Sequence, residues 1–127
     1  MDPQVAAWIA SAEADLRAAL TLQAGGHALH AVFTCHLVVE KALKALVQAR
    51  TGTLPPKTQN LAILASMTGV EISKEHRAIV AALSGVSAVV RYVLDLDEAQ
   101  RQYPPDRVAV FLADAEGLLT WARSSLR

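Results

Sequence analysis

Apolar residues recur every three to four positions in each long segment of this chain, and this spacing constrains its fold more than any other feature. Such a spacing places apolar side chains on one face of an α-helix, whereas a half-buried strand would alternate apolar and polar residues. The pattern therefore predicts helices joined by short connections and gives no support for strands. The segments are separated by Gly25-Gly26, Gly52, Pro55-Pro56, Gly69 and Pro104-Pro105.

The first predicted helix begins with Asp2 as its N-cap and Pro3 at its first helical position, and it ends at the glycine pair. The second helix extends from about His27 to Arg50. A proline-containing loop follows, and a short helix comes after it, which Thr58 is expected to cap and Gly69 to close. Long helices joined by so short a turn are expected to pack side by side and antiparallel.

Ser73 is predicted to cap a third long helix. Its inward positions continue as far as Val93 and Leu94, and the segment then becomes acidic at residues 95–98. The last helix is expected to begin after the second proline pair with Asp106 as its N-cap. Four long helices, one short helix and brief connections predict an all-α fold: an up-and-down antiparallel four-helix bundle with a short extra helix, in a single domain over residues 1–127.

The second helix is unusual because it is apolar on nearly all sides between Ala28 and Val39. A helix of this kind has to be surrounded in order to be stable in water. Two arrangements would achieve this: the helix is the central member of the bundle, or a second copy of the protein covers it.

The chain has 12 Lys and Arg residues and 12 Asp and Glu residues, so its formal net charge is zero. A neutral chain lacks the positive excess that holds basic proteins to nucleic acid by counterion release, so we expect no DNA binding and only local contact with a nucleotide or RNA. Cys35 is the only cysteine, which excludes an intrachain disulfide and fits a reducing compartment. The start of the chain is acidic where a signal peptide is positive, and no apolar run approaches the ~20 residues of a membrane span. We therefore expect a cytoplasmic protein with no membrane contact.

Few polar residues form a recognisable catalytic or metal-binding pattern. His36 and Glu40 share one helix face at a spacing that suits two metal ligands. No other helix supplies a matching pair, so we expect His36 to be a hydrogen-bonded residue near the core. Cys35 is adjacent to His36, but adjacent helical residues point about a hundred degrees apart and do not form a nucleophile and base. The sequence therefore predicts no catalytic residue, no metal and no cofactor.

Small groups of positive charge are candidates for contacting a phosphate. One group lies in the second helix and the loop after it, and another lies at the end of the third helix and its exit. An alternative for Lys44 is an ion pair with Glu40, four residues earlier on the same helix. The candidate nucleotide- or RNA-binding residues are Lys41, Lys44, Lys57, Arg91, Arg101 and Tyr103.

The run from Phe33 to Leu46, Phe-Thr-Cys-His-Leu-Val-Val-Glu-Lys-Ala-Leu-Lys-Ala-Leu, resembles the signature of HEPN domains. The surroundings agree in order: an early Trp8, a Leu-Pro-Pro-Lys-Thr loop ending at Thr58, a late Tyr-Pro after an arginine, and a closing helix with Trp121. The resemblance covers nearly the whole chain. It implies a small helical bundle that is usually a homodimer.

HEPN proteins include ribonucleases and non-catalytic members, and the resemblance implies one of these two roles. The ribonucleases carry an arginine followed after four to six residues by a histidine, and the dimer duplicates this pair into one composite site. Many other members act beside small nucleotidyltransferases as partner, toxin or nucleotide-binding subunit.

This sequence departs from the ribonuclease pattern. Its last histidine is His76, so neither Arg91 nor Arg101 is followed by one, and the group that transfers protons is missing. The loop motif, commonly Lys-Thr-His-Asp-Leu, continues here with the neutral amides Gln59 and Asn60, which do not transfer protons.

The main expectation is therefore a non-catalytic HEPN homodimer that contacts a nucleotide or RNA and is the partner subunit of a nucleotidyltransferase in a toxin-antitoxin-like pair. One alternative is an atypical HEPN ribonuclease, a toxin that uses Arg91 or Arg101 with Tyr103. A second alternative is a purely structural dimerisation module.

Overall fold

The computed structural model describes residues 1–91 and 95–126, and for residues 87–91 it describes the backbone but not the side chains. The described residues form helices and no strands, which confirms the all-α class. The helices are α1 (Pro3–Ala24), α2 (Ala28–Thr51), α3 (Leu61–Met67), α4 (Lys74–Arg91), α5 (Leu96–Arg101) and α6 (Pro105–Ser125).

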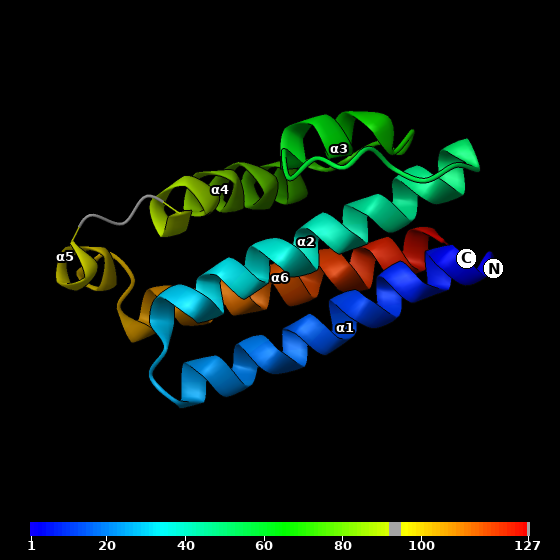
Figure 1. Cartoon of the computed structure of the whole chain (residues 1–127). Helices are drawn as coiled ribbons and strands as arrows, with labels where there is room; N and C mark the ends of the chain where they lie inside the picture. The colour runs from blue at the N-terminus through cyan, green and yellow to red at the C-terminus, as the bar shows by residue number, and fades with distance from the viewer. Residues whose placement is uncertain (92–94, 127) are drawn as a thin grey trace.

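The four long helices run in alternating directions along the chain, and the two termini lie at the same end of the molecule (Figure 1). Helix α2 is central, because α1, α6, α4 and α3 all pack against it. This arrangement is compatible with the predicted up-and-down bundle. The additional short helices, α3 and α5, lie at opposite ends of the bundle (Figure 1).

The first half of the chain follows the sequence prediction closely. The Asp2 carboxylate accepts a hydrogen bond of 2.7 Å from the Gln4 N–H, and Pro3 is the first residue of α1. Helix α2 ends at Gly52, whose φ of 73° lies in the left-handed region that glycine adopts without strain. Ser73 also caps α4 as predicted, because its Oγ accepts from the His76 N–H at 3.2 Å.

Two predicted caps are wrong. Asn60, not Thr58, caps α3, since the Asn60 side chain accepts from the Ile63 N–H at 3.1 Å. Thr58 instead accepts from the Asn60 N–H at 3.1 Å and so orders the turn before the helix. Helix α6 begins two residues earlier than predicted, with Pro105 at its first position, so Asp106 lies in the first turn rather than at the cap. Both places suit these residues, because proline fits the first helical position and a carboxylate is stabilised by the helix dipole there.

The third long helix does not continue to residue 98 as predicted. Helix α4 ends at Arg91, and α5 begins after Asp95, which caps it by accepting from the Glu98 N–H at 3.1 Å. An aspartate that bonds to the backbone three residues ahead starts a new helix instead of extending the previous one. The predicted inward positions Val93 and Leu94 lie outside the described residues.

The bundle itself accounts for the apolar surface of α2. Val32, Val38 and Val39 have no exposed surface within the single chain. Of the two arrangements left open by the sequence, the central position of α2 explains this burial without a second copy. Phe33 and Leu37 remain partly exposed. Within the described part of the chain, no helix combines the length and apolarity needed to cross a bilayer.

Candidate functional site

Four buried polar residues follow one stripe of α2. His36, Glu40, Lys44 and Gln48 recur at four-residue intervals, and their exposed fractions are 1%, 7%, 8% and 3%. Residues four apart on a helix lie above one another, so this spacing makes a continuous line of polar side chains. We call these four residues the α2 polar ladder. A buried polar line of this length is stable only where its members find partners.

Contacts within the ladder and with α1 provide those partners. The Lys44 Nζ donates to Glu40 Oε2 at 3.1 Å, which confirms the ion pair that the spacing suggested. The same ammonium lies 5.5 Å from the centroid of the Trp8 ring. The Trp8 Nε1 donates to Gln48 Oε1 at 2.8 Å, and the Gln48 amide donates to Gln4 Oε1. The ladder therefore binds α1 to α2.

The other end of the ladder brings His36 close to Glu40. The His36 Nδ1 lies 3.7 Å from Glu40 Oε1, and the imidazole is parallel to the Phe33 ring with centroids 6.4 Å apart. The Lys44 ammonium already neutralises Glu40, which makes the pair a poor cation site. No group of three or more His, Cys, Asp or Glu residues that could hold a metal ion occurs within residues 1–91 and 95–126.

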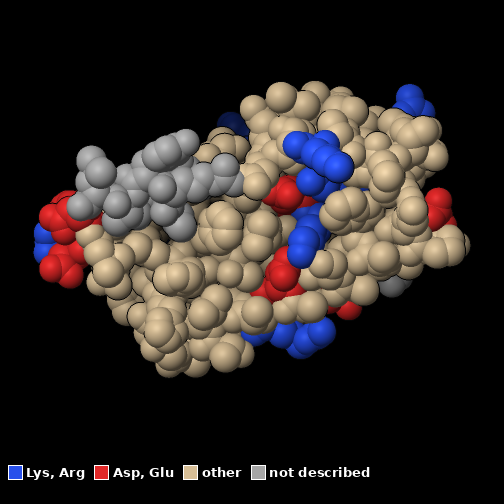
Figure 2. All heavy atoms as spheres, viewed as in Figure 1, with Lys and Arg blue, Asp and Glu red and all other residues tan. Residues whose placement is uncertain are grey.

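Lys41 is also paired with a carboxylate. Its Nζ lies 2.7 Å from Asp15 Oδ2 and 2.7 Å from Ser11 Oγ, both on α1. Its side chain is 23% exposed, so it is more accessible than Lys44. Blue and red side chains alternate in a band across the middle of the face shown in Figure 2. Lys41 and Lys44, the two lysines of the sequence motif, are thus each paired with a carboxylate in the folded chain.

The remaining candidates lie elsewhere. Lys57 is exposed in the loop between α2 and α3. Arg101 is exposed on α5, where its guanidinium bonds to Glu98 Oε2 at 2.6 Å. Tyr103 is only 4% exposed, with its ring 6.0 Å from that of Phe111. The loop and α5 are at opposite ends of the bundle (Figure 1), so one protomer does not bring Lys57 and Arg101 into one site.

Arg91 is the last residue of α4, and its side chain lies outside the described residues. Lys41 and Lys44 approach α1, not the end of the bundle where α5 lies. The six predicted residues therefore divide among the middle of α2, the loop after it and the region around α5.

Cys35 is buried next to the ladder. Burial, with a smaller contribution from the negative charge of Asp114, raises the pKa of the Cys35 thiol to about 12. Burial also raises the pKa of the Asp114 carboxyl above its usual range. A thiol with such a pKa is almost never a thiolate at neutral pH, so Cys35 has the properties of a small apolar core residue.

Three residues that take part in these contacts were not among the predicted site residues. Gln48 continues the four-residue spacing from His36, and extending that count would have found it. Trp8 lies on another helix, so no local pattern pairs it with Lys44. Arg107, the third, lies with its guanidinium carbon 4.8 Å from the centroid of the Tyr103 ring and donates to the Gln102 carbonyl at 2.6 Å.

The sequence model of the HEPN domain matches residues 5–125. The chain belongs to the HEPN family. Its fold is similar to the crystal structure of ST0689, an archaeal HEPN homologue, with a TM-score of 0.79 and 20% identity over 97% of this chain and 98% of that one. It is also similar to the crystal structure of TT1696 from Thermus thermophilus, with a TM-score of 0.83 and 20% identity over 95% and 97% of the two chains. At this identity the two structures show the HEPN fold alone. A comparison with curated proteins gave no match.

Proposed function

We propose that this HEPN protein is non-catalytic and acts as a homodimer that contacts a nucleotide or RNA. Its place would be as the partner subunit of a nucleotidyltransferase in a toxin-antitoxin-like pair. The observation that carries the non-catalytic role is the position of the histidines: His27, His30, His36 and His76 all precede Arg91 and Arg101. No arginine of the chain is followed by a histidine at the spacing of the HEPN ribonuclease motif.

The surroundings of two of the four histidines support this proposal, while His27 and His30 are exposed near the start of α2 and follow no arginine at the motif spacing. A general acid or base must come within hydrogen-bonding distance of the atom whose proton it moves. His36 is 1% exposed and lies between Phe33 and Glu40, where a phosphodiester has no access. The His76 ring lies 4.8 Å from the centroid of Trp121 and is part of the packing between α4 and α6.

Exposed cations support the binding role more than buried ones do. Lys57 and Arg101 are accessible, and a dimer would present two copies of each. Lys44 would first have to leave Glu40, and the buried Glu40 carboxylate would then lose the hydrogen bond to its Oε2. We therefore assign first contact with a phosphate to Lys57 and Arg101, keep Arg91 as a candidate because of its position at the end of α4, and assign Lys41 and Lys44 to the packing of α2 on α1. Because the net charge is zero, affinity for long polyanions should be weak.

The first test is incubation of the purified protein with RNA. We expect intact RNA, because the proton-transferring group is missing. Cleavage that Arg91→Ala abolishes would overturn the non-catalytic role. Calorimetry with nucleotides and short RNA tests binding separately. Lys57→Ala is expected to weaken binding, and the matched control is Lys74→Ala, which removes a different exposed lysine, on α4.

The partner role is tested by co-purification with a short nucleotidyltransferase encoded in the neighbouring reading frame. A stable complex would support it, and a neighbouring enzyme that does not associate would count against it. No heat with any nucleotide, RNA or partner enzyme would favour a structural dimerisation module.

The alternative of an atypical ribonuclease is tested by expression in cells. Tyr103 is suited to packing, since it is 4% exposed, and Tyr103→Phe removes its hydroxyl while preserving its ring. Growth arrest that Tyr103→Phe or Arg101→Ala relieves would favour the toxin. Growth unaffected by the parent protein would favour the non-catalytic role.

A further inference from the structure

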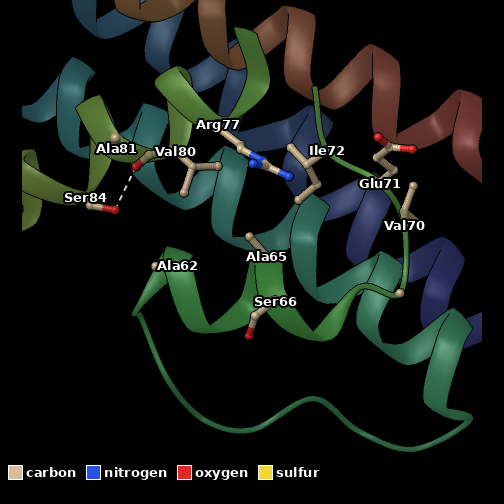
Figure 3. A pocket seen from close by; sticks show the side chains of 11 residues that line it. Ala62, Ala65, Ser66, Val70, Glu71, Ile72, Arg77, Val80, Ala81 and Ser84 are labelled. Atoms are coloured by element: carbon tan, nitrogen blue, oxygen red, sulfur yellow. Dashed lines mark hydrogen bonds between the residues drawn. The ribbon is translucent and has the colours of Figure 1, made fainter. Parts of the chain in front are cut away.

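A groove with a cavity volume of about 490 Å³ lies between α3 and α4. Its walls are mainly apolar: Ala62 and Ala65 come from α3, Ile72 from the connection after it, and Val80 and Ala81 from α4 (Figure 3). Val70 at its edge is 37% exposed. A volume between roughly 300 and 1,000 Å³ is typical of sites for small ligands. We call this cavity the α3–α4 groove.

One charged side chain points into the groove. The Arg77 guanidinium extends from α4 toward Ile72 (Figure 3). Within the described part of the chain, no hydrogen bond or ion pair engages this guanidinium, in contrast to Arg101 and Arg123, which pair with Glu98 and Glu13. Arginine presents five N–H donors and is charged at every accessible pH. The groove therefore contains an uncommitted cation beside apolar walls.

The other polar groups of the groove limit what that cation can bind. The hydroxyl of Ser66 donates to the Ile63 carbonyl at 2.6 Å, and the hydroxyl of Ser84 donates to the Val80 carbonyl at 2.7 Å. Neither hydroxyl proton is free for an anion. Glu71 also lines the groove, on the far side of Ile72 from Arg77 (Figure 3), and its negative charge disfavours a second anionic group nearby. The charges therefore suit a single anion.

We propose that the α3–α4 groove binds a small amphiphile with an apolar body and one anionic group, a carboxylate or a sulfonate. The body lies against the apolar walls, and the anion receives charge-assisted hydrogen bonds from Arg77. A nucleotide fits less well, because its phosphates carry more than one charge and meet one guanidinium and one carboxylate. This site is separate from the nucleotide and RNA contacts proposed above, so each proposal can fail without the other.

The experiment uses the full chain and two probes. Anilinonaphthalene sulfonate reports binding by its fluorescence, and calorimetry measures octanoate, which should displace the dye. Arg77→Met keeps the apolar stem and removes the charge, and it should weaken octanoate binding about tenfold, the effect of losing a charge-assisted hydrogen bond. Arg17→Met is the matched control, because Arg17 is an exposed arginine on α1, and α1 packs on α2 and α6 rather than on the groove. It should leave affinity unchanged.

A second variant fills the groove. Ala81 is exposed and lines it, so Ala81→Phe should fold like the parent and abolish binding of both probes. Adenosine monophosphate should displace the dye much less than octanoate does. Three results would each overturn the proposal: no octanoate binding at millimolar concentration, octanoate affinity unchanged in Arg77→Met, or a ligand-free dimer that Ala81→Phe dissociates. The last result would assign the groove to a second copy of the chain.

Discussion

Replacing Lys44 with methionine is expected to destabilise the protein by about 3–5 kcal/mol, the usual cost of removing one partner from a buried ion pair. The Lys44 and Glu40 side chains are only 10% and 9% exposed, with 3.1 Å between Nζ and Oε2. Without the ammonium, the Glu40 carboxylate stays buried with neither oxygen hydrogen-bonded, because Oε1 already has no such partner among the described residues. The variant also loses the contact between the ammonium and the Trp8 ring.

The double variant Glu40→Leu, Lys44→Met separates the cost of an unpaired charge from the value of the pair. Neither charge remains, so its stability should lie within about 1 kcal/mol of the parent, although Glu40→Leu alone should cost about as much as Lys44→Met alone. The magnitude of the single changes arises from desolvation. It does not measure how strongly the two groups attract each other in the folded protein.

The assay is urea unfolding followed by circular dichroism, with the free energy of unfolding extrapolated to water. Arg101→Met is the matched control, because it removes an ion pair at the i,i+3 spacing whose side chains are 65% and 57% exposed. This change should cost less than about 1 kcal/mol. A loss below about 1 kcal/mol for Lys44→Met, or a double variant as unstable as the two single changes added together, would refute the reasoning. Lys44 would then be solvated and available to a phosphate.

Four further results are expected. Cys35, with its thiol pKa at about 12, should react with iodoacetamide at pH 8 at least about a hundredfold more slowly in the native protein than in urea, and equal rates would show an accessible thiol. The raised pKa of Asp114 means that the folded state holds its proton more tightly than the unfolded state; stability is therefore lost as pH rises through the folded pKa. Asp114→Asn should accordingly raise the free energy of unfolding at pH 7 and not at pH 3, and an equal gain at both would contradict this cause. Val39→Glu should lower the free energy of unfolding by about 3–5 kcal/mol, because Val39 has no exposed surface. If circular dichroism shows a folded chain and light scattering shows a monomer, Val39 lies instead at a dimer interface. Gly69→Ala should cost about 1–2 kcal/mol in thermal unfolding, since Gly69 has a φ of 68° and a Cβ there would collide with the Arg50 side chain; an unchanged melting temperature would refute the strain.

Local chemistry explains which helix ends were predictable. Asp2, Gly52 and Ser73 each act within a few residues along the chain, so their roles follow from the sequence. The caps of α3 and α6 were each misplaced by two residues. Asn60 is as good a cap as Thr58, and in α6 Pro105 takes the first helical position two residues before the predicted one. The end of α4 was missed for a different reason: the apolar spacing continues past Arg91, while the aspartate at 95 starts a new helix.

The sequence indicated which residues could contact a phosphate, but not which partners most of them have in the folded chain. The spacing of Glu40 and Lys44 implied an ion pair, and the structure confirms it. Nothing in the sequence indicates that Lys41 meets Asp15 or that Tyr103 is buried, because these contacts depend on how α1 and α6 pack. The uncommitted Arg77 was not singled out, since only the arrangement of α3 and α4 forms a groove around it.

The sequence by itself determined that this chain is helical, where most of its helices begin and end, and that it resembles HEPN domains without their ribonuclease histidine. These properties depend on backbone chemistry and periodicity within a few residues, or on the identity of residues in a motif. Only the tertiary structure decided that α2 is covered within a single chain, that Lys44 is buried beside Trp8, and that Arg77 faces an open groove. Burial and charge pairing are set by side chains distant in sequence, and only their assembly in space fixes which cations are neutralised and which remain free.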